Sequence, residues 1–116
     1  MPSDLDTLQA AQRAFAVERD WEQFHTPRNL AAALSVEAAE LLEHFQWLTE
    51  QQSRNLPEAK RVAVGEEIAD VLLYLLRLAD VLQIDVAAAT RRKLQLNAEK
   101  YPVERARGSM RKYNEL

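Results

Sequence analysis

Residues that break helices are rare in this sequence, and that rarity constrains the fold more than any other feature. Glycine occurs twice and proline four times among 116 residues, whereas 47% of the residues are hydrophobic and 28% are charged. Disordered chains, collagen-like repeats and turn-rich all-β folds have different compositions. The sequence therefore predicts an all-α protein, and its length predicts a single domain over residues 1–116.

Several protein classes are disfavoured by what the sequence lacks. The longest purely apolar run, Val71–Leu76, ends at Arg77, whereas a membrane-spanning helix needs about 20 apolar residues. There is no cysteine, which excludes disulfide bridges and thiolate metal sites. The first residues do not combine a basic region with an apolar stretch, so secretion is not indicated. We expect a cytoplasmic protein without a membrane span.

Caps, prolines and apolar spacing predict four helices. We expect them at about residues 3–20, 27–50, 58–82 and 85–100. Ser3 with Asp6 resembles a capping box at the start of the first helix, and Asn55 is a candidate cap for the third. Short connections favour antiparallel packing of neighbouring helices, so the expected architecture is a four-helix bundle.

The end of the chain differs from the rest in structure and in charge. Pro102 stops the last helix, so an irregular tail, residues 101–116, is expected after a helical core of about residues 3–100. Residues 1–90 carry 7 basic and 15 acidic side chains, and residues 91–116 carry 8 basic and 3 acidic ones. A long polyanion would be repelled by the acidic body, so this pattern favours a small anion over a nucleic acid as partner.

The third predicted helix has a wide apolar face at helical spacing. Its members are Ile68, Val71, Leu75, Leu78, Ala79 and Leu82. Glu66, Arg77 and Asp80 are expected on the opposite, polar side. Leu73 also falls on that side, which leaves two interpretations open: cover by another chain, or a singly exposed leucine.

Two pairs of acidic residues with a spacing of three lie on successive predicted helices. Glu37 and Glu40 form one pair, and Glu67 and Asp70 form the other. Each pair borders the apolar stripe of its helix at a matching angle. If the two helices pack antiparallel, four carboxylates share a small space, where two charges about 5 Å apart repel by roughly 3 kcal/mol at an effective dielectric of 20. One pair alone is more simply solvated helix surface, but two matched pairs favour a bound cation.

The ligand set indicates the kind of cation. Carboxylate oxygens suit hard ions such as Mg²⁺ or Mn²⁺, and Mg²⁺ commonly bridges carboxylates to phosphate oxygens. A di-iron carboxylate bundle is the competing interpretation, but it needs two Glu-x-x-His motifs. The two histidines, His25 and His44, do not supply two such motifs. The sequence therefore favours Mg²⁺.

Basic and aromatic residues predict the rest of a nucleotide site. Lys93, Asn97 and Lys100 form a stripe on the fourth helix and are followed by Tyr101. This stripe suits phosphates opposite a metal, although a solvated charged face explains it equally well.

Aromatic residues also gather in the loop before the second helix. Trp21, Phe24 and His25 lie there, and stacking on a nucleotide base is one use for aromatic side chains in a loop. Trp47 is a further candidate to line the pocket, although core packing is the favoured interpretation for Trp47 taken alone.

The acidic pairs and their flanking strings resemble a known family. Glu37-x-x-Glu40 followed by Glu67-x-x-Asp70 resembles the metal signature of the MazG-like all-α nucleoside triphosphate pyrophosphohydrolases. Further strings resemble the dCTP pyrophosphatase branch of that family, and they are Glu18–His25, Pro27–Leu30, Phe45–Trp47, Glu66–Tyr74 and Lys100–Val103. The resemblance extends over about residues 8–114.

The resemblance implies a function and a set of site residues. It implies Mg²⁺-dependent cleavage of a nucleoside triphosphate, with dCTP or 5-methyl-dCTP preferred, to the monophosphate and pyrophosphate, a housecleaning role in nucleotide metabolism. The metal ligands and catalytic residues would be Glu37, Glu40, Glu67 and Asp70. The substrate-binding residues would be Trp21, His25, Trp47, Tyr74, Lys93, Asn97 and Tyr101. The family also forms homodimers or dimers of dimers with shared sites.

Two other functions remain open at this point. One is a non-catalytic helical dimerisation module whose acidic pairs are surface residues. The other is a nucleotide-binding regulator that no longer turns its ligand over, although the intact set of four acidic residues disfavours it. Within the leading hypothesis, the water-activating base is one of the four carboxylates or Glu43.

Overall fold

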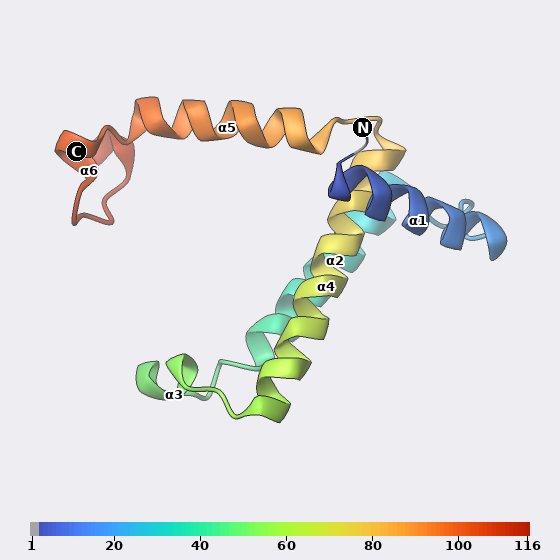
Figure 1. Cartoon of the computed structure of the whole chain (residues 1–116), viewed down its shortest axis with the longest axis horizontal. Coiled ribbons are helices and arrows are strands. Elements are labelled where there is room, and N and C mark those ends of the chain that lie inside the picture. The colour runs from blue at the N-terminus through green and yellow to red at the C-terminus, as the bar shows by residue number, and fades with distance from the viewer. Residues whose placement is uncertain (1–2) are drawn as a thin grey trace. The chain divides into compact units, whose positions relative to one another are not determined.

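The computed structural model describes residues 3–116, and in that range every regular element is a helix (Figure 1). The elements are α1 (Asp4–Glu18), α2 (Pro27–Glu43), α3 (Glu50–Arg54), α4 (Glu58–Val81), α5 (Val86–Lys100), α6 (Val103–Ala106) and the 3₁₀ helix η1 (Tyr113–Glu115). The all-α prediction is confirmed. None of the helices in this range has the length and hydrophobicity of a membrane-spanning segment.

Side-chain caps fix three of the helix starts where the sequence predicts them. Ser3 Oγ accepts a hydrogen bond from the Asp6 N–H, and Asp6 Oδ2 accepts one from the Ser3 N–H, both at 3.1 Å, so the capping box is confirmed. Thr26 caps α2 by accepting from the Asn29 N–H. Asp85 caps α5 in the same way. These bonds satisfy backbone donors that the first turn of a helix leaves free.

The predicted end of the second helix, at about Glu50, is wrong. The helix ends at Glu43, and a separate short helix, α3, begins at Glu50. Thr49 separates α3 from the preceding segment, because it is the N-cap of α3 in a capping box with Gln52. An N-cap residue has extended backbone angles, here φ −72° and ψ 166°, so one continuous helix cannot pass through it.

Two further boundary predictions are corrected. Asn55 does not cap α4: it is the C-cap of α3, and Pro57 precedes α4 without a side-chain cap bond. The tail is not wholly irregular, because α6 follows Pro102 and η1 lies near the C-terminus. Pro102 lacks an N–H and has extended backbone angles, which suits the residue before a first helical turn as well as the end of α5.

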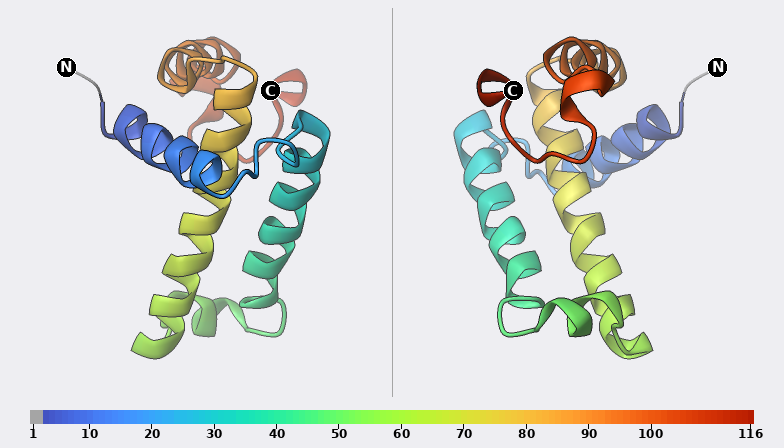
Figure 2. Two further views of the ribbon diagram at one scale, coloured as in Figure 1. Left: turned by 90° about the vertical axis from the view of Figure 1, so that its right-hand side faces the viewer. Right: turned by 90° about the vertical axis from the view of Figure 1, so that its left-hand side faces the viewer.

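The chain divides into two compact units, Met1–Ile84 and Asp85–Leu116. In the first unit, α1 and α2 both pack against α4. Figure 2 shows α2 and α4 running antiparallel, with α3 in the connection at one end. The second unit contains α5, α6 and η1. The helix pair α2 and α4 therefore brings the two acidic pairs of the sequence onto neighbouring helices.

The core of the first unit is small, and it does not follow the predicted apolar face of α4. Its buried apolar residues are Ala16, Leu30, Val64, Leu76 and Ala79. Three members of the predicted face, Ile68, Leu75 and Leu82, are 45–52% exposed, whereas Arg77 is only 4% exposed. The reason is that α1 and α2 cover α4 from two sides, including the side that carries Arg77. Leu73 is half-buried within the chain itself.

Candidate metal centre

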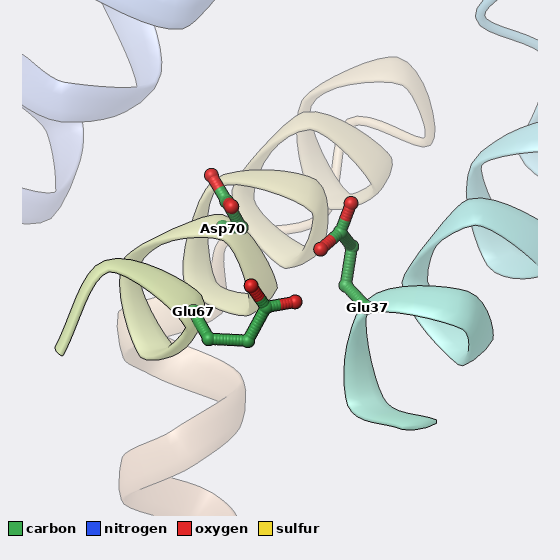
Figure 3. A group of neighbouring side chains, drawn as sticks. All are labelled: Glu37, Glu67 and Asp70. Atoms are coloured by element: carbon green, nitrogen blue, oxygen red, sulfur yellow. The ribbon is translucent and has the colours of Figure 1, made fainter. Parts of the chain in front are cut away.

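Three carboxylates from two helices converge in the first unit. Glu37 on α2 and both Glu67 and Asp70 on α4 each offer an oxygen, and these oxygens all lie within 4.8 Å of one another. Figure 3 shows Glu37 reaching across from α2 toward the two acids of α4. The spacing of three residues places Glu67 and Asp70 on the same side of α4, one turn apart. The antiparallel pair of helices thus builds a compact acidic cluster.

Glu40, the fourth acidic residue of the sequence pattern, acts on the same cluster. It follows Glu37 by three residues on α2, and its carboxylate raises the pKa of Glu67 both through a side-chain hydrogen-bonding interaction and through its charge. The four predicted acids therefore lie near one another: oxygens of Glu37, Glu67 and Asp70 form the compact group, and Glu40 interacts with Glu67.

The crowding changes the acid–base chemistry of Glu67. Its pKa is raised from 4.5 to about 7. The largest cause is the neighbouring Glu37 carboxylate, which can accept a hydrogen bond from Glu67 only when Glu67 is protonated; burial, which disfavours the charged form, comes next. Repulsion from the charges of Glu37 and Glu40 adds to the effect. Without a cation the cluster thus retains a proton near neutral pH.

The donor set fits a hard divalent cation. Glu37 Oε2 and Glu67 Oε1 are buried without a hydrogen-bond partner, and a buried polar atom normally has one. Across residues 3–116, the ion pairs join Arg13, Arg19, Arg61 and Arg77 to Asp80, Glu18 or Glu58, and none involves this cluster. Oxygen-only ligands suit Mg²⁺ or Mn²⁺. A bound cation would satisfy the orphaned oxygens and remove the repulsion.

In the segment between α1 and α2, Trp21 lies against α1 and His25 lies against α4. The Trp21 ring meets the Phe15 ring edge-on with centroids 5.6 Å apart, and it meets the His25 ring at 6.1 Å. Trp21 is nevertheless 42% exposed. The indole thus packs against two neighbouring rings and keeps part of its surface exposed.

Trp47 and Tyr74 occupy different surroundings. Trp47 lies in the turn after α2 and is 86% exposed, so core packing within the chain, the interpretation that the sequence favours for Trp47 taken alone, is wrong. Tyr74 is half-buried on α4, one turn after Asp70. Neither the Trp47 nor the Tyr74 side chain is fully buried within the chain.

The basic stripe lies in the second unit. Lys93, Asn97 and Lys100 are exposed on α5, and Tyr101 is its C-cap. The Tyr101 ring packs edge-on against Tyr113 at 6.2 Å, and Lys100 Nζ lies 4.9 Å from the centre of the Tyr113 ring. These contacts order the end of α5 within its own unit.

Sequence reasoning missed one polar group of the first unit. Arg77 and Asp80, predicted on an exposed polar face, form a largely buried ion pair that also contacts His25 and Arg13. The spacing of Arg77 and Asp80 is visible in the sequence. Their contacts with residues more than 50 positions away are not, and these contacts are what bury the pair.

Comparison with known proteins places the chain among relatives. A family model described as the MazG-like family matches residues 32–116. The dCTP pyrophosphatase 1 of Homo sapiens is 44% identical over 114 residues, which make up 97% of this chain and 67% of that protein. The dCTP pyrophosphatase 1 of Mus musculus is 45% identical over the same shares of both chains.

A solved structure agrees with these relatives. The crystal structure of a pyrophosphatase from Archaeoglobus fulgidus DSM 4304 is similar to this chain with a TM-score of 0.81 and 44% sequence identity. The match covers 86% of this chain and 94% of that one. The sequence comparison and the structure comparison therefore both find proteins named as pyrophosphatases.

Proposed function

The chain belongs to the MazG-like family, and from this premise we propose that it is a nucleoside triphosphate pyrophosphohydrolase that converts dCTP to dCMP and pyrophosphate. The observation that carries the proposal is the acidic cluster of Glu37, Glu67 and Asp70, found in a chain that is 44% identical to a dCTP pyrophosphatase. We extend the preferred substrates to 5-methyl-dCTP and the role to housecleaning of the nucleotide pool in the cytoplasm.

The acidic cluster would hold Mg²⁺, with Mn²⁺ as a substitute, through Glu37, Glu40, Glu67 and Asp70. The pKa of about 7 at Glu67 means that this residue must release a proton to serve as a ligand. When bound, the ion supplies charge neutralisation at the phosphate oxygens and a lower pKa for a bound water. The proton acceptor for the attacking water is one of these carboxylates or Glu43, one turn after Glu40 on α2.

Aromatic and basic residues would bind the rest of the nucleotide. Trp21 keeps part of its surface exposed, and we propose that it stacks on the base, with His25 and Trp47 in the same pocket. For the sugar and the triphosphate we propose Tyr74, Lys93, Asn97 and Tyr101. A lysine ammonium near the phosphates would neutralise charge that develops on the departing pyrophosphate.

The single chain leaves much apolar surface uncovered, which supports a homo-oligomer. Large apolar side chains that are more than half exposed occur in both units: they include Val36, Leu42, Val62 and Ile68 in the first, and Leu94, Val103 and Met110 in the second. Extensive exposed apolar surface commonly marks a protein–protein interface. We propose a dimer or a dimer of dimers, in which α1, α2, α4 and α5 contribute to a four-helix bundle and residues 1–116 act as one domain.

Nucleotide turnover tests the function directly. The chain is incubated with a panel of dNTPs and NTPs, with and without Mg²⁺, and the products are separated by phosphate chromatography. The proposal predicts dCMP and pyrophosphate from dCTP, only with the metal. Orthophosphate and dCDP would show cleavage at a different bond, and absence of turnover would favour the dimerisation module or, if dCTP still binds, the regulator.

Sedimentation equilibrium tests the assembly. A mass of two or four times 13.3 kDa at micromolar concentration is the expected result. A mass of 13.3 kDa would contradict the oligomer, and with it the proposal that sites are completed between chains.

A further inference from the structure

A continuous set of polar contacts crosses the first unit beside the segment that carries Trp21. Arg77 on α4 donates from Nε to His25 Nδ1 at 3.0 Å and from Nη1 to Asp80 Oδ2 at 3.0 Å. Asp80 also accepts from Arg13 on α1, whose Nε lies 2.8 Å from Oδ2. We call Arg13, Asp80, Arg77 and His25 the paired network. Its two guanidinium groups share one carboxylate.

The direction of the Arg77–His25 bond determines the chemical form of the imidazole. A guanidinium has only N–H donors, so His25 Nδ1 must be the acceptor and cannot carry a proton. In a neutral ring, the single proton then lies on Nε2. A second proton would break the bond and place a positive charge beside Arg77. In agreement, burial and then the charge of Arg77 hold the pKa of His25 below its usual 6.5.

The Arg77 guanidinium is buried and bonded to neighbouring side chains instead of being solvated. It is 4% exposed, and burial of an unpaired guanidinium is costly. Asp80 neutralises it, and Arg13 in turn occupies the other oxygen of Asp80 at 2.5 Å. The Nε–H of Arg77 therefore remains directed at His25, which lies edge-on to the Trp21 ring.

We propose that Arg77 is a positioning residue that fixes His25 as a neutral, Nε2-protonated imidazole, so that the segment beside Trp21 presents one obligate hydrogen-bond donor to the nucleotide base. This inference rests on the proposed function, because it takes the base to stack at Trp21. Cytosine has two acceptors on its pairing edge, O2 and N3. A donor that cannot change into an acceptor matches them, and it disfavours an N–H group at the same place.

The first test reads the tautomer without any nucleotide. Two-bond ¹⁵N–¹H correlation spectra of the ¹⁵N-labelled full chain report which imidazole nitrogen carries the proton, and only His25 and His44 contribute; the variant His44→Gln assigns them. We expect a single Nε2–H form for His25 in the wild type. In Arg77→Met we expect mixed tautomers and a titration midpoint shifted to higher pH. A protonated Nδ1 in the wild type overturns the proposal even if the variant does not fold.

A matched control distinguishes loss of the Arg77–His25 hydrogen bond from loss of a positive charge in the paired network. Arg13→Met removes the other guanidinium bound to Asp80, but Arg13 does not contact His25. Its His25 spectrum should keep the single tautomer. Equal disturbance in Arg13→Met and Arg77→Met would show a general structural effect and contradict a specific role for Arg77.

The second test measures how Arg77 variants change the KM and kcat for dCTP. Arg77→Met should raise the KM for dCTP by about 2-fold to 12-fold, the range of one neutral hydrogen bond, with kcat within about twofold. Arg77→Lys, which retains a donor, should recover part of the loss. In a His25→Phe background, Arg77→Met should add nothing, because its partner is gone.

The outcomes of the two tests remain distinguishable. An equal rise of KM with and without His25 would overturn the positioning role, as would an unchanged KM in Arg77→Met. Absence of dCTP cleavage by the wild type would overturn the proposed function and the base-recognition step together. The tautomer of His25 is read independently of that result.

Discussion

Two polar regions on the same helix follow opposite electrostatic rules. The paired network near the end of α4 alternates charges, and Asp80 has an arginine on each side. The acidic cluster near the middle of α4 gathers like charges, raises the pKa of Glu67 to about 7 and leaves two buried oxygens without a partner. The paired network satisfies its charges within the chain, whereas the acidic cluster needs a cation from outside. This difference distinguishes a structural polar group from a ligand site.

The largest predicted effect separates the two regions by activity. Asp70→Asn and Glu40→Gln should each lower kcat for dCTP by well over tenfold, because a lost ligand charge costs more than the 1.4 kcal/mol that a factor of ten represents. Circular dichroism should show an unchanged helix content. Glu66→Gln, an exposed neighbour on α4, is the control and should retain its activity. A variant at Asp70 or Glu40 that keeps more than a tenth of kcat would remove that residue from the ligand set.

The second prediction compares the same substitution at two positions of α4. Without metal, Asp80→Asn should lower the stability by about 3 kcal/mol, because it leaves the buried Arg77 without its counter-charge. Asp70→Asn should instead raise the melting temperature, because it relieves repulsion in the acidic cluster. Thermal unfolding in the presence of a chelator measures both. Destabilisation of both variants to a similar extent would contradict the distinction between the regions.

The third prediction concerns the segment that the paired network holds against α4. Trp21→Ala should raise the KM for dCTP about 5-fold to 150-fold, which corresponds to the roughly 1–3 kcal/mol of a base stacked on an aromatic ring. The value of kcat should change little, because the base lies far from the reacting phosphate. Steady-state kinetics with dCTP and dTTP should show a similar loss for both bases. Phe24→Ala, in the same segment, is the matched control, and an unchanged KM in Trp21→Ala would place the base elsewhere.

The smallest predicted effect is a pH dependence of stability without metal. Because the pKa of Glu67 is about 7 in the folded chain and 4.5 ordinarily, the folded state binds the extra proton between these values. The contribution of Glu67 to stability is therefore present at pH 4.5 and is lost as the pH rises through 7. Melting temperatures of the wild type and Glu67→Gln, measured from pH 5 to pH 8, should diverge in favour of the variant. Saturating Mg²⁺ should reverse the order at pH 8, and parallel curves without metal would refute the raised pKa.

The sequence predicts local features of this fold well because local chemistry decides them. Ser3, Thr26-Pro27 and Asp85 start helices where their short-range hydrogen bonds require it. The break at Thr49 was missed, although the spacing of Thr49 and Gln52 is that of a capping box. The prediction of one helix to about Glu50 overlooked this cap signal.

The site is predictable to the extent that helix periodicity brings its parts together. The two acidic pairs repeat one spacing on two helices, and antiparallel packing of α2 and α4 then makes Glu37 meet Glu67 and Asp70. The burial of the Arg77–Asp80 pair was not predictable, because it depends on His25, which contacts Arg77, and on Arg13, which contacts Asp80. A charged side chain at helical spacing is expected in solvent unless such distant partners are known.

The most direct test of the central claim is a titration of the metal-free protein with Mn²⁺, in which electron paramagnetic resonance measures the free ion. Mn²⁺ uses the same oxygen ligands as Mg²⁺, and pH 8 keeps Glu67 deprotonated. The wild type and Asp80→Asn should bind the ion, whereas Asp70→Asn should bind it at least tenfold more weakly. Equal binding by the wild type and Asp70→Asn, or no binding by the wild type, would contradict the assignment of the acidic cluster as the metal centre.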